Sequence, residues 1–469
     1  MSLAQRNRGS YRDPAGLIYE YNGQIYRAIH RFGSTSYETV RNSGILSKAI
    51  DEGFLVDCIE LPTTEWPAEL ETVSYVIEHP RLPYISYPYE WSFSQLKAAA
   101  LHHLNFQLML LEHGFKLTDA SAYNIQFVGV KPIFIDLLSI APYVEGEFWL
   151  GHRQFCEQFL NPLLLRSELG ITHNAWYRGA LEGIPTASLS KLLPFHKKLS
   201  WKVFSHILLP TRLERQAASS PEKAIARVKA TGKFSKLAYA GFLTQLKNWI
   251  STLHPLDTGK TTWADYAKVN TYSDHEKNLK KQFVADFIAK TRPEFVIDLG
   301  CNTGDYSIVA LEAGAGRVTG FDFDQHAIDM AFSRSYAEIA DKTRFLPLWL
   351  DASNPSPDQG WMQQERMGFQ SRSKANVLLA LAFEHHLAIA KNIPLEQVVD
   401  WLLSLAPQGV IEFVPKQDST VQRMLALRAD IFEAYTLENF EKILTARANI
   451  SAKLALSTHG RVLFCYHAL

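Results

Sequence analysis

Hydrophobic and polar positions change their spacing part-way along this chain of 469 residues. From about residue 294 onwards, short apolar runs alternate with stretches whose apolar residues recur at helical spacing. This alternation predicts a mostly parallel sheet covered by helices on both faces, which is the α/β class. Strands are expected at residues 295–300, 317–324, 344–352, 376–384, 409–415, 450–457 and 461–468, and helices at 394–406 and from about 420 to 445. The last two strands can pair as a hairpin at the sheet edge, around the turn "THG".

The pattern before residue 212 predicts a different arrangement. Short strands are expected at residues 16–21, 24–30, 74–79 and 83–88, and helices at 37–52 and 92–114, with mostly helix after residue 145. Strands gathered at one end and helices at the other indicate an α+β domain with a small strand-rich lobe and a larger helical lobe.

A change in composition marks the boundary between these two patterns. Residues 212–262 begin polar and charged, continue with helical apolar spacing and end in a turn-rich stretch. We therefore expect a disordered leader at 1–10, an α+β domain at 11–211, a helical linker at 212–262 and an α/β domain at 263–469. The length fits two domains.

Charge and cysteine content exclude several classes of protein. Lys plus Arg number 48 and Asp plus Glu also number 48, so no overall basic field favours nucleic acid or an anionic membrane. The four cysteines are far apart and form no CxxC pair, which argues against a disulfide framework or a structural zinc site, and no metal site is predicted. No secretory signal and no bilayer-length apolar run is visible, so we expect a cytoplasmic protein.

The stretch "VIDLGCNTGDYS" carries the first candidate site. Glycines at 300 and 304 allow a tight turn after a buried strand, and the next helix begins with free N–H groups. A carboxylate-bearing ligand can bind at such a terminus, although a glycine turn alone often serves only packing. About twenty residues later Asp322 ends the second strand, where an acidic side chain can accept ribose hydroxyls, and Asp351-Ala352 ends the third, where adenine can be recognised. Three strand ends therefore predict an adenosine-like ligand.

These motifs, in this order, resemble the class I, Rossmann-like S-adenosylmethionine-dependent methyltransferases over roughly the last two hundred residues. The resemblance implies a doubly wound sheet and S-adenosylmethionine as the cofactor, with Asp298 at its methionine part, Asp322 at the ribose and Asp351 at the adenine. The segment at 263–288 looks like a lid over that cofactor, or alternatively a packing helix. The implied cofactor-binding residues are Asp298, Gly300, Asn302, Gly304, Asp322, Asp351, Ala352, Tyr272 and Lys277. A domain that has lost its cofactor and a nicotinamide-dependent reductase are the alternatives.

Methyl transfer to a protonated nucleophile needs a base near the carboxyl ends of the strands. His385 and His386 follow the fourth strand, and a histidine is suited to take up a proton near neutral pH. Spacing does not decide between them, and either histidine can instead hold the loop by hydrogen bonds.

The first half contains Asp119, Asn124 and Asp136 in a spacing that suits phosphoryl transfer, where one Asp orients a hydroxyl and the other two residues hold Mg²⁺. This stretch looks like the catalytic loop of the protein-kinase-like and aminoglycoside-phosphotransferase-like fold, which implies ATP and Mg²⁺. However, no glycine-rich loop and no strand lysine of the kinase type is identifiable. A degenerate domain that binds the acceptor or a partner, and a chance match, are the alternatives.

Taken whole, the arrangement resembles a group of bacterial host-specificity proteins of nodulation, which implies a small-molecule or saccharide-linked acceptor. We therefore expect a methyltransferase fused behind a kinase-like accessory domain. The rival hypotheses are a phosphotransferase, alone or combined with the methyltransferase, and a regulatory protein that binds S-adenosylmethionine without turnover.

Overall fold

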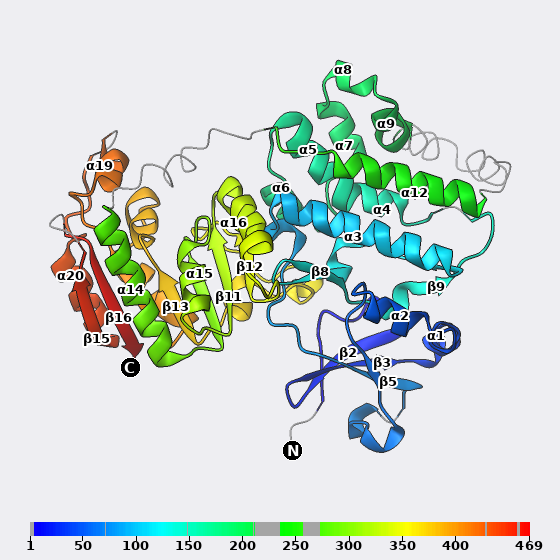
Figure 1. Ribbon diagram of the computed structural model, residues 1–469, viewed down its shortest axis with the longest axis horizontal. Helices are drawn as coiled ribbons and strands as arrows, with labels where there is room; N and C mark the ends of the chain where they lie inside the picture. The colour runs from blue at the N-terminus through cyan, green and yellow to red at the C-terminus, as the bar shows by residue number, and fades with distance from the viewer. Residues whose placement is uncertain are drawn as a thin grey trace. The chain divides into compact units, whose positions relative to one another are not determined.

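The computed structural model describes residues 4–70, 72–147, 149–209, 211, 235–256, 273–426, 429–456 and 460–469. The chain forms two compact units (Figure 1). The first comprises the described residues within Met1–Phe127, Pro132–Thr258 and Gln359–Arg366, and the second those within Val128–Lys131, Gly259–Asp358 and Met367–Leu469. No helix in these described ranges combines the length and apolar character that crossing a bilayer requires.

A seven-stranded sheet forms the centre of the second unit. The strands lie in the order β12-β11-β10-β13-β14-β16-β15, with the first five parallel and β16 antiparallel to both of its neighbours. Their bounds are β10 (Phe295–Leu299), β11 (Arg317–Asp322), β12 (Phe345–Trp349), β13 (Val377–Ala380), β14 (Gln408–Phe413), β15 (Ala448–Ala455) and β16 (Val462–Ala468). The expected parallel sheet and its edge hairpin are confirmed.

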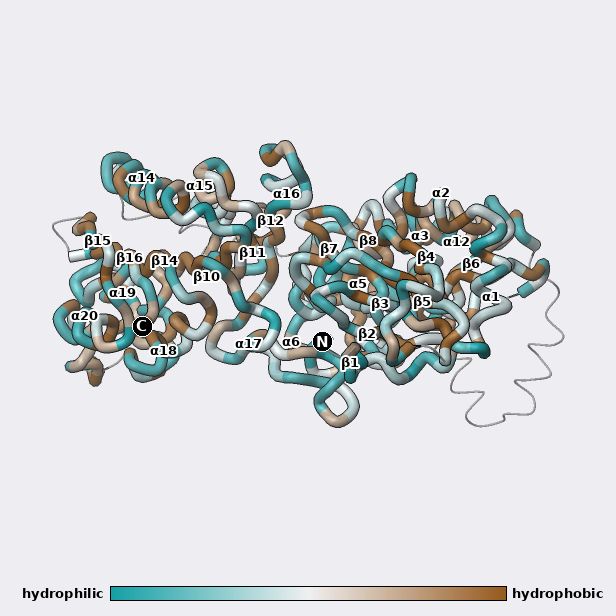
Figure 2. Tube along the Cα trace, turned by 90° about the horizontal axis from the view of Figure 1, so that it is seen from below, coloured by the Kyte–Doolittle hydropathy of each residue, from teal (hydrophilic) through white to brown (hydrophobic). Residues whose placement is uncertain are grey.

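Helices cover both faces of this sheet, because most positions of its central strands are buried and apolar. All four residues of β13 are buried, as expected for a strand without a solvent face. Figure 2 shows α14, α15 and α16 on one side of the strands and α17 and α18 on the other. The helices of the unit are α14 (Asp274–Thr291), α15 (Asp305–Glu312), α16 (Gln325–Glu338), α17 (Phe369–Arg372), η9 (His386–Ala390), α18 (Leu395–Leu405), α19 (Ser419–Leu425) and α20 (Leu437–Thr445).

One helical prediction in this unit was wrong. The stretch from 420 to 445 forms two helices, α19 and α20, and not one continuous run. Tyr435, between them, is buried and donates its hydroxyl to the Val414 carbonyl at 2.7 Å, while the Glu384 carboxylate lies 2.8 Å from the same oxygen. A buried hydrogen-bonded tyrosine therefore fixes the chain between the two helices.

The first unit begins with an antiparallel sheet in the order β1-β2-β3-β5-β4. Its strands are β1 (Gln5–Arg6), β2 (Gly16–Tyr21), β3 (Gln24–Ile29), β4 (Ile59–Glu60) and β5 (Tyr75–His79). The leader expected to be disordered thus contributes β1. The helix expected at 37–52 begins earlier and is divided into α1 (Arg31–Asn42) and α2 (Ile45–Asp51), because Gly44 adopts a positive φ of 77° between them.

The helical part of the first unit is built around α3 (Phe93–Glu112), which begins with a capping box between Ser92 and Gln95. The strand expected at 83–88 is absent. The Gln126 side-chain amide bonds both the N–H and the carbonyl of Ser86, at 2.9 and 3.0 Å, so this backbone is satisfied without a neighbouring strand. Other elements are η1 (Thr63–Glu65), η2 (Ala68–Leu70), η3 (Pro88–Glu90), β6 (Phe115–Leu117), η4 (Ala122–Asn124), β7 (Ile125–Val128), β8 (Lys131–Phe134), η5 (Leu137–Ser139) and β9 (Ile140–Pro142).

The remaining helices of this part include one from the stretch expected to be a linker. Buried residues of α12, among them Tyr239 and Leu243, pack it into the first unit, and the Tyr239 hydroxyl accepts a 2.8 Å hydrogen bond from Gln107 on α3. Residues 236–251 thus belong to the first domain and not to a linker. The helices are α4 (His152–Phe155), η6 (Cys156–Leu160), α5 (Asn161–Leu169), α6 (Asn174–Gly179), α7 (Thr186–Leu192), α8 (Phe195–Lys198), α9 (Trp201–Val203), η7 (Phe204–Leu208), α12 (Lys236–Ser251) and, from the segment Gln359–Arg366 that is grouped with this unit, η8 (Trp361–Gln363).

Candidate functional site

A cavity of about 480 Å³ lies at the carboxyl ends of the central parallel strands of the second unit. Parallel strands end at one edge of a sheet, so the residues that follow β10, β11, β12 and β13 meet there. The cavity is lined by Gly300, Cys301, Asn302, Asp322, Phe323, Asp324, Asp351, Ala352, Ser353, Ala382 and Phe383 from those strand ends, and by Lys277, Lys280, His386 and Leu387 from neighbouring helices.

The two glycines of the turn after β10 have different structural roles. Gly300 lines the cavity with a φ of 73°, and a Cβ there would lie 3.1 Å from the Phe383 side chain. Gly304 does not line the cavity, and a Cβ there would lie 2.7 Å from the Phe345 ring. The first glycine therefore keeps the cavity wall open, whereas the second permits the helix to pack closely on β12.

Asp322 is held at the cavity wall by backbone donors. Its two carboxylate oxygens accept the N–H groups of Asn302 at 2.9 Å and Asp324 at 2.8 Å. Burial raises the pKa of Asp322 to about 6, and the two N–H groups oppose that shift. The side chain is thus ionised at neutral pH, in a fixed orientation.

Asp351, which follows β12, is held by hydrogen bonds within the turn that it begins. Its Oδ1 accepts the Ser353 N–H at 3.0 Å and the Ser353 hydroxyl at 2.6 Å. Ala352 and Ser353 also line the cavity, so a carboxylate and neighbouring backbone groups face it together.

Asp298 lies behind the turn and does not line the cavity. It is only 1% exposed, accepts the Ser307 hydroxyl at 2.6 Å, and burial raises its pKa to about 7. The expected direct contact with the cofactor is therefore not supported by its position. Asp298 instead joins the end of β10 to α15.

A buried ionic network that the sequence analysis missed lies beside the cavity. Lys280 Nζ is 2.6 Å from Glu412 on β14, and Glu412 also lies 3.3 Å from Arg461 Nη1. Burial lowers the pKa of Lys280, whereas Glu412 acts in the opposite direction. The signal was present in the sequence, because Lys280 follows Lys277 by one helical turn and so shares its helix face. Lys277 also lines the cavity and pairs with Asp274 at 3.6 Å.

The two adjacent histidines have different surroundings. His386 lines the cavity, whereas His385 is fully buried, does not line it and lies 3.8 Å from the Glu384 carboxylate. Their rings are 4.2 Å apart. Burial lowers the pKa of His386 well below its ordinary value, so its imidazole is neutral at neutral pH. Tyr272, the remaining expected contact, lies outside the described residues.

The three residues with phosphotransferase spacing lie together in the first unit. Asn124 donates to Asp119 Oδ2 at 3.2 Å, and burial followed by the nearby Asp136 carboxylate raises the pKa of Asp119. Asp136 forms an ion pair of 2.8 Å with Arg27 of β3 and accepts the Ser139 hydroxyl at 2.5 Å. The carboxylate expected to hold Mg²⁺ is thus already neutralised by a guanidinium.

Comparison with known proteins places the chain in a family. It is 48% identical over 462 residues to the nodulation protein NoeA of Rhizobium meliloti (strain 1021), an alignment that covers 98% of this chain and 96% of that protein. The chain belongs to the NoeA family of nodulation proteins. No family model matches it.

Shorter similarities to methyltransferases are also present. The ribosomal protein L11 methyltransferase of Shewanella sp. (strain ANA-3) is 30% identical over 128 residues, which covers 24% of this chain and 43% of that enzyme. The NoeA family member thus matches less than half the length of that relative. Among solved structures, the magnesium protoporphyrin IX methyltransferase ChlM of Synechocystis PCC 6803 with bound SAM aligns over 44% of this chain and 92% of its own, at 18% identity and a TM-score of 0.30. The N-methyltransferase NodS of Bradyrhizobium japonicum WM9 aligns over 42% and 98%, at 11% identity and the same TM-score of 0.30.

Proposed function

We propose that this NoeA family member binds S-adenosylmethionine in its second unit and transfers the methyl group to a small-molecule or saccharide-linked acceptor. The observation that carries the proposal is the convergence of a glycine turn and two strand-end carboxylates on one cavity of about 480 Å³. A cavity of this size accommodates a nucleoside-sized ligand.

The residues at the cavity fit the parts of that cofactor. Asp322 is suited to accept the ribose hydroxyls, because each carboxylate oxygen keeps a second lone pair after accepting one backbone N–H. Asp351 and Ala352 offer an acceptor and backbone groups for the adenine edge, and the Gly300 turn lets the methionine part approach the backbone. The bound cofactor supplies an electrophilic methyl group on a sulfonium.

His386 is the proposed base. It lies in the cavity wall, and its neutral imidazole has a lone pair that can accept the proton of an acceptor hydroxyl or amine. His385, which is buried away from the cavity, is proposed to orient the ring of its neighbour and not to touch the acceptor.

The proposal also covers the acceptor and the role of the first unit. Family membership with a nodulation protein makes saccharide-linked compounds the first class of acceptor to screen. For the first unit we propose a kinase-like domain that binds the acceptor or a partner without phosphoryl transfer, because Arg27 occupies the carboxylate that Mg²⁺ would need.

Calorimetric titration of the full chain with S-adenosylmethionine and S-adenosylhomocysteine tests the central claim. We expect Asp322→Asn to weaken both by roughly 10- to 100-fold, since hydrogen bonds to a charged group contribute about 1.5–3 kcal/mol. Asp286→Asn, on an exposed position of α14, is the matched control and should bind as the wild type does. No binding of either ligand, or equal binding by Asp322→Asn, would disprove the proposed cofactor site. Conversion to S-adenosylhomocysteine with a screened acceptor then distinguishes an enzyme from a binding protein.

A further inference from the structure

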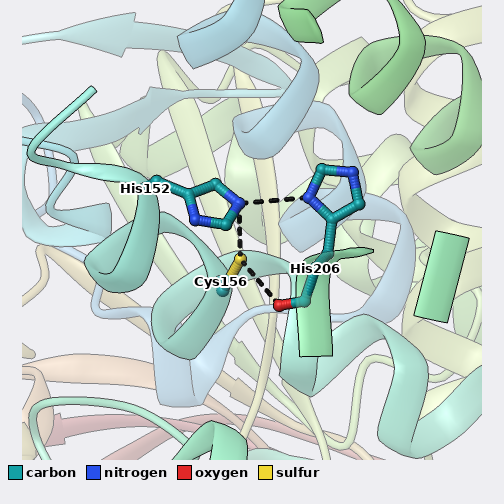
Figure 3. Close-up of side chains that lie close together, drawn as sticks. All are labelled: His152, Cys156 and His206. Carbon is teal, nitrogen blue, oxygen red and sulfur yellow. Dashed lines mark hydrogen bonds between the residues drawn. The ribbon is translucent and has the colours of Figure 1, made fainter. Parts of the chain in front are cut away.

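Three side chains of the metal-ligating type meet in the helical part of the first unit (Figure 3). His152 lies on α4, Cys156 begins η6 one turn later, and His206 comes from η7, about fifty residues further along the chain. His152 Nε2 is 3.1 Å from His206 Nδ1 and 3.4 Å from Cys156 Sγ. All three potential ligand atoms lie within 4.8 Å of one another.

These separations match the edges of a tetrahedral metal site. With metal–nitrogen bonds of about 2.0–2.1 Å and metal–sulfur bonds of about 2.3 Å, tetrahedral angles give nitrogen–nitrogen edges of roughly 3.3 Å and nitrogen–sulfur edges of roughly 3.6 Å. The observed 3.1 and 3.4 Å are each close to these values. One ion could therefore be bound with only a small outward movement of the side chains.

Hydrogen bonds account for only part of this arrangement: the two rings share one N–H···N bond, and the Cys156 thiol makes a long hydrogen bond of 3.9 Å to the His206 carbonyl oxygen (Figure 3). A neutral imidazole nitrogen has either one proton or one lone pair, and His152 Nε2 has two neighbours at contact distance, a nitrogen and a sulfur. A cation in the space between the three atoms would instead accept a lone pair from each of them.

The local backbone gives a second, independent observation. Cys156 and His206 both lie in π-helical turns, Cys156–Leu160 and Phe204–Leu208. Such turns are rare and occur frequently at functional sites, because the extra residue shifts side chains from their α-helical positions. Here, two π-helical turns each contribute one residue to the same cluster.

The surroundings favour uncharged imidazoles. Rings of α12 cover the cluster, with Phe242 at 5.3 Å from His152 and 5.1 Å from His206 between ring centroids, and Trp249 at 5.7 Å from His206. Burial lowers the pKa of His152 to about 4 and that of His206 to about 3, so each ring is neutral at neutral pH and has one nitrogen lone pair. Burial also raises the pKa of the Cys156 thiol, so metal binding would form a metal–thiolate bond and release the thiol proton to solvent.

We propose that His152, Cys156 and His206 bind one zinc-class divalent ion, which connects α4 and η6 to η7 in the helical part of the first unit. A two-nitrogen, one-sulfur ligand set suits Zn²⁺ and Co²⁺ and does not suit Mg²⁺ or Ca²⁺. The sequence pattern indicated no metal site because the chain has no CxxC pair, whereas the ligands proposed here include a His and a Cys four residues apart.

The test uses the full chain after dialysis against a chelator, titrated with zinc sulfate and, separately, with cobalt chloride. We expect one equivalent of tight binding and a thiolate-to-cobalt charge-transfer absorption. Cys156→Ala should lose that absorption and weaken zinc binding at least about 100-fold, and His206→Ala should also weaken it. Cys58→Ala, outside the cluster, is the matched control and should leave both unchanged.

Three results would overturn the proposal: no stoichiometric binding by the wild type, equal binding by Cys156→Ala, or retention of the charge-transfer band in that variant. Because removal of a buried side chain can prevent folding, X-ray absorption at the zinc edge of the wild type provides a readout that needs no variant. A shell of two nitrogens and one sulfur from the protein is expected, and a shell without sulfur would contradict the site.

Discussion

The two groups of acidic residues that the sequence marks out differ in what their carboxylates contact. In the second unit, Asp322 accepts two backbone N–H groups and faces a cavity of about 480 Å³. In the first unit, Asp136 pairs with the Arg27 guanidinium at 2.8 Å. Backbone N–H groups orient a carboxylate and leave its charge in place, whereas a guanidinium neutralises that charge. The difference explains why the same residue type supports the proposed ligand site in one unit and argues against a metal site in the other.

The largest effect is expected from the buried ion pairs near each group. Glu412→Gln removes the carboxylate that pairs with the buried Lys280, whereas Arg461 keeps its ion pair with Asp418 at 2.7 Å, so we expect a loss of about 3–5 kcal/mol in the free energy of unfolding, mainly from Lys280. Asp136→Asn should cost less, about 1–3 kcal/mol, because its pair with Arg27 is less completely buried. Denaturant unfolding measures both losses.

Glu441→Gln is the control for these ion pairs. Its partner Lys453 is exposed, so the change should cost less than about 1 kcal/mol. An equal loss in Glu412→Gln and Glu441→Gln would show that the Lys280 network contributes nothing beyond an ordinary surface pair.

The glycine turn gives the next largest effect. Gly304→Ala should cost about 2–4 kcal/mol, because the added Cβ would lie 2.7 Å from the Phe345 ring on a backbone with a φ of 87°. Gly314→Ala shares the positive φ, at 107°, but meets nothing within 4 Å, so it should cost only about 1 kcal/mol. Thermal unfolding measures the loss of stability in both variants. Similar losses would show that the positive φ alone, and not the contact with Phe345, requires glycine at position 304.

The third largest effect is expected in a pH titration of ligand binding. It tests the Asp322 carboxylate, which backbone N–H groups orient, and not the Asp136 carboxylate, which is paired with Arg27. The pKa of Asp322 is raised from 3.8 to about 6, so S-adenosylhomocysteine binding should weaken roughly 10-fold between pH 7 and pH 5 as the carboxylate is protonated. Calorimetry in Asp322→Asn should show no such step. A step of the same size in that variant would assign the titration to another group.

The stability of the ligand-free protein should change with pH in the opposite direction. A folded-state pKa above the unfolded value means that the folded state holds the proton more tightly. The contribution of Asp322 is therefore fully present below about pH 4 and is lost as the pH rises through about 6, and Asp298 acts in the same direction up to about pH 7. A general loss of structure at low pH would lower both ligand binding and stability. Opposite pH dependences of the two would therefore argue against that explanation.

The sequence predicted most of the second unit because its signals are local. Apolar runs at strand spacing located all seven strands, and the strand ends located Asp322 and Asp351 at one cavity. Contacts distant in sequence were not predictable in this way. Examples are the Arg27–Asp136 pair, the Glu412 partner of Lys280, and the insertion of Gln359–Arg366 into the first unit. Burial also separated His385 from His386, and adjacent residues carry no signal for that.

The smallest effect is expected from ATP with Mg²⁺ on the full chain. If Arg27 neutralises Asp136, the pair cannot hold a metal–phosphate complex without first separating, so the thermal unfolding of the wild type should be nearly unchanged by the nucleotide. A clear rise in the unfolding temperature that Asp136→Ala removes would contradict this expectation and restore phosphoryl transfer as an activity of the first unit. The matched variant Asp286→Asn should respond as the wild type does. The contrast between the carboxylates of the two units therefore depends on the Arg27–Asp136 ion pair, and a nucleotide titration tests that contrast directly.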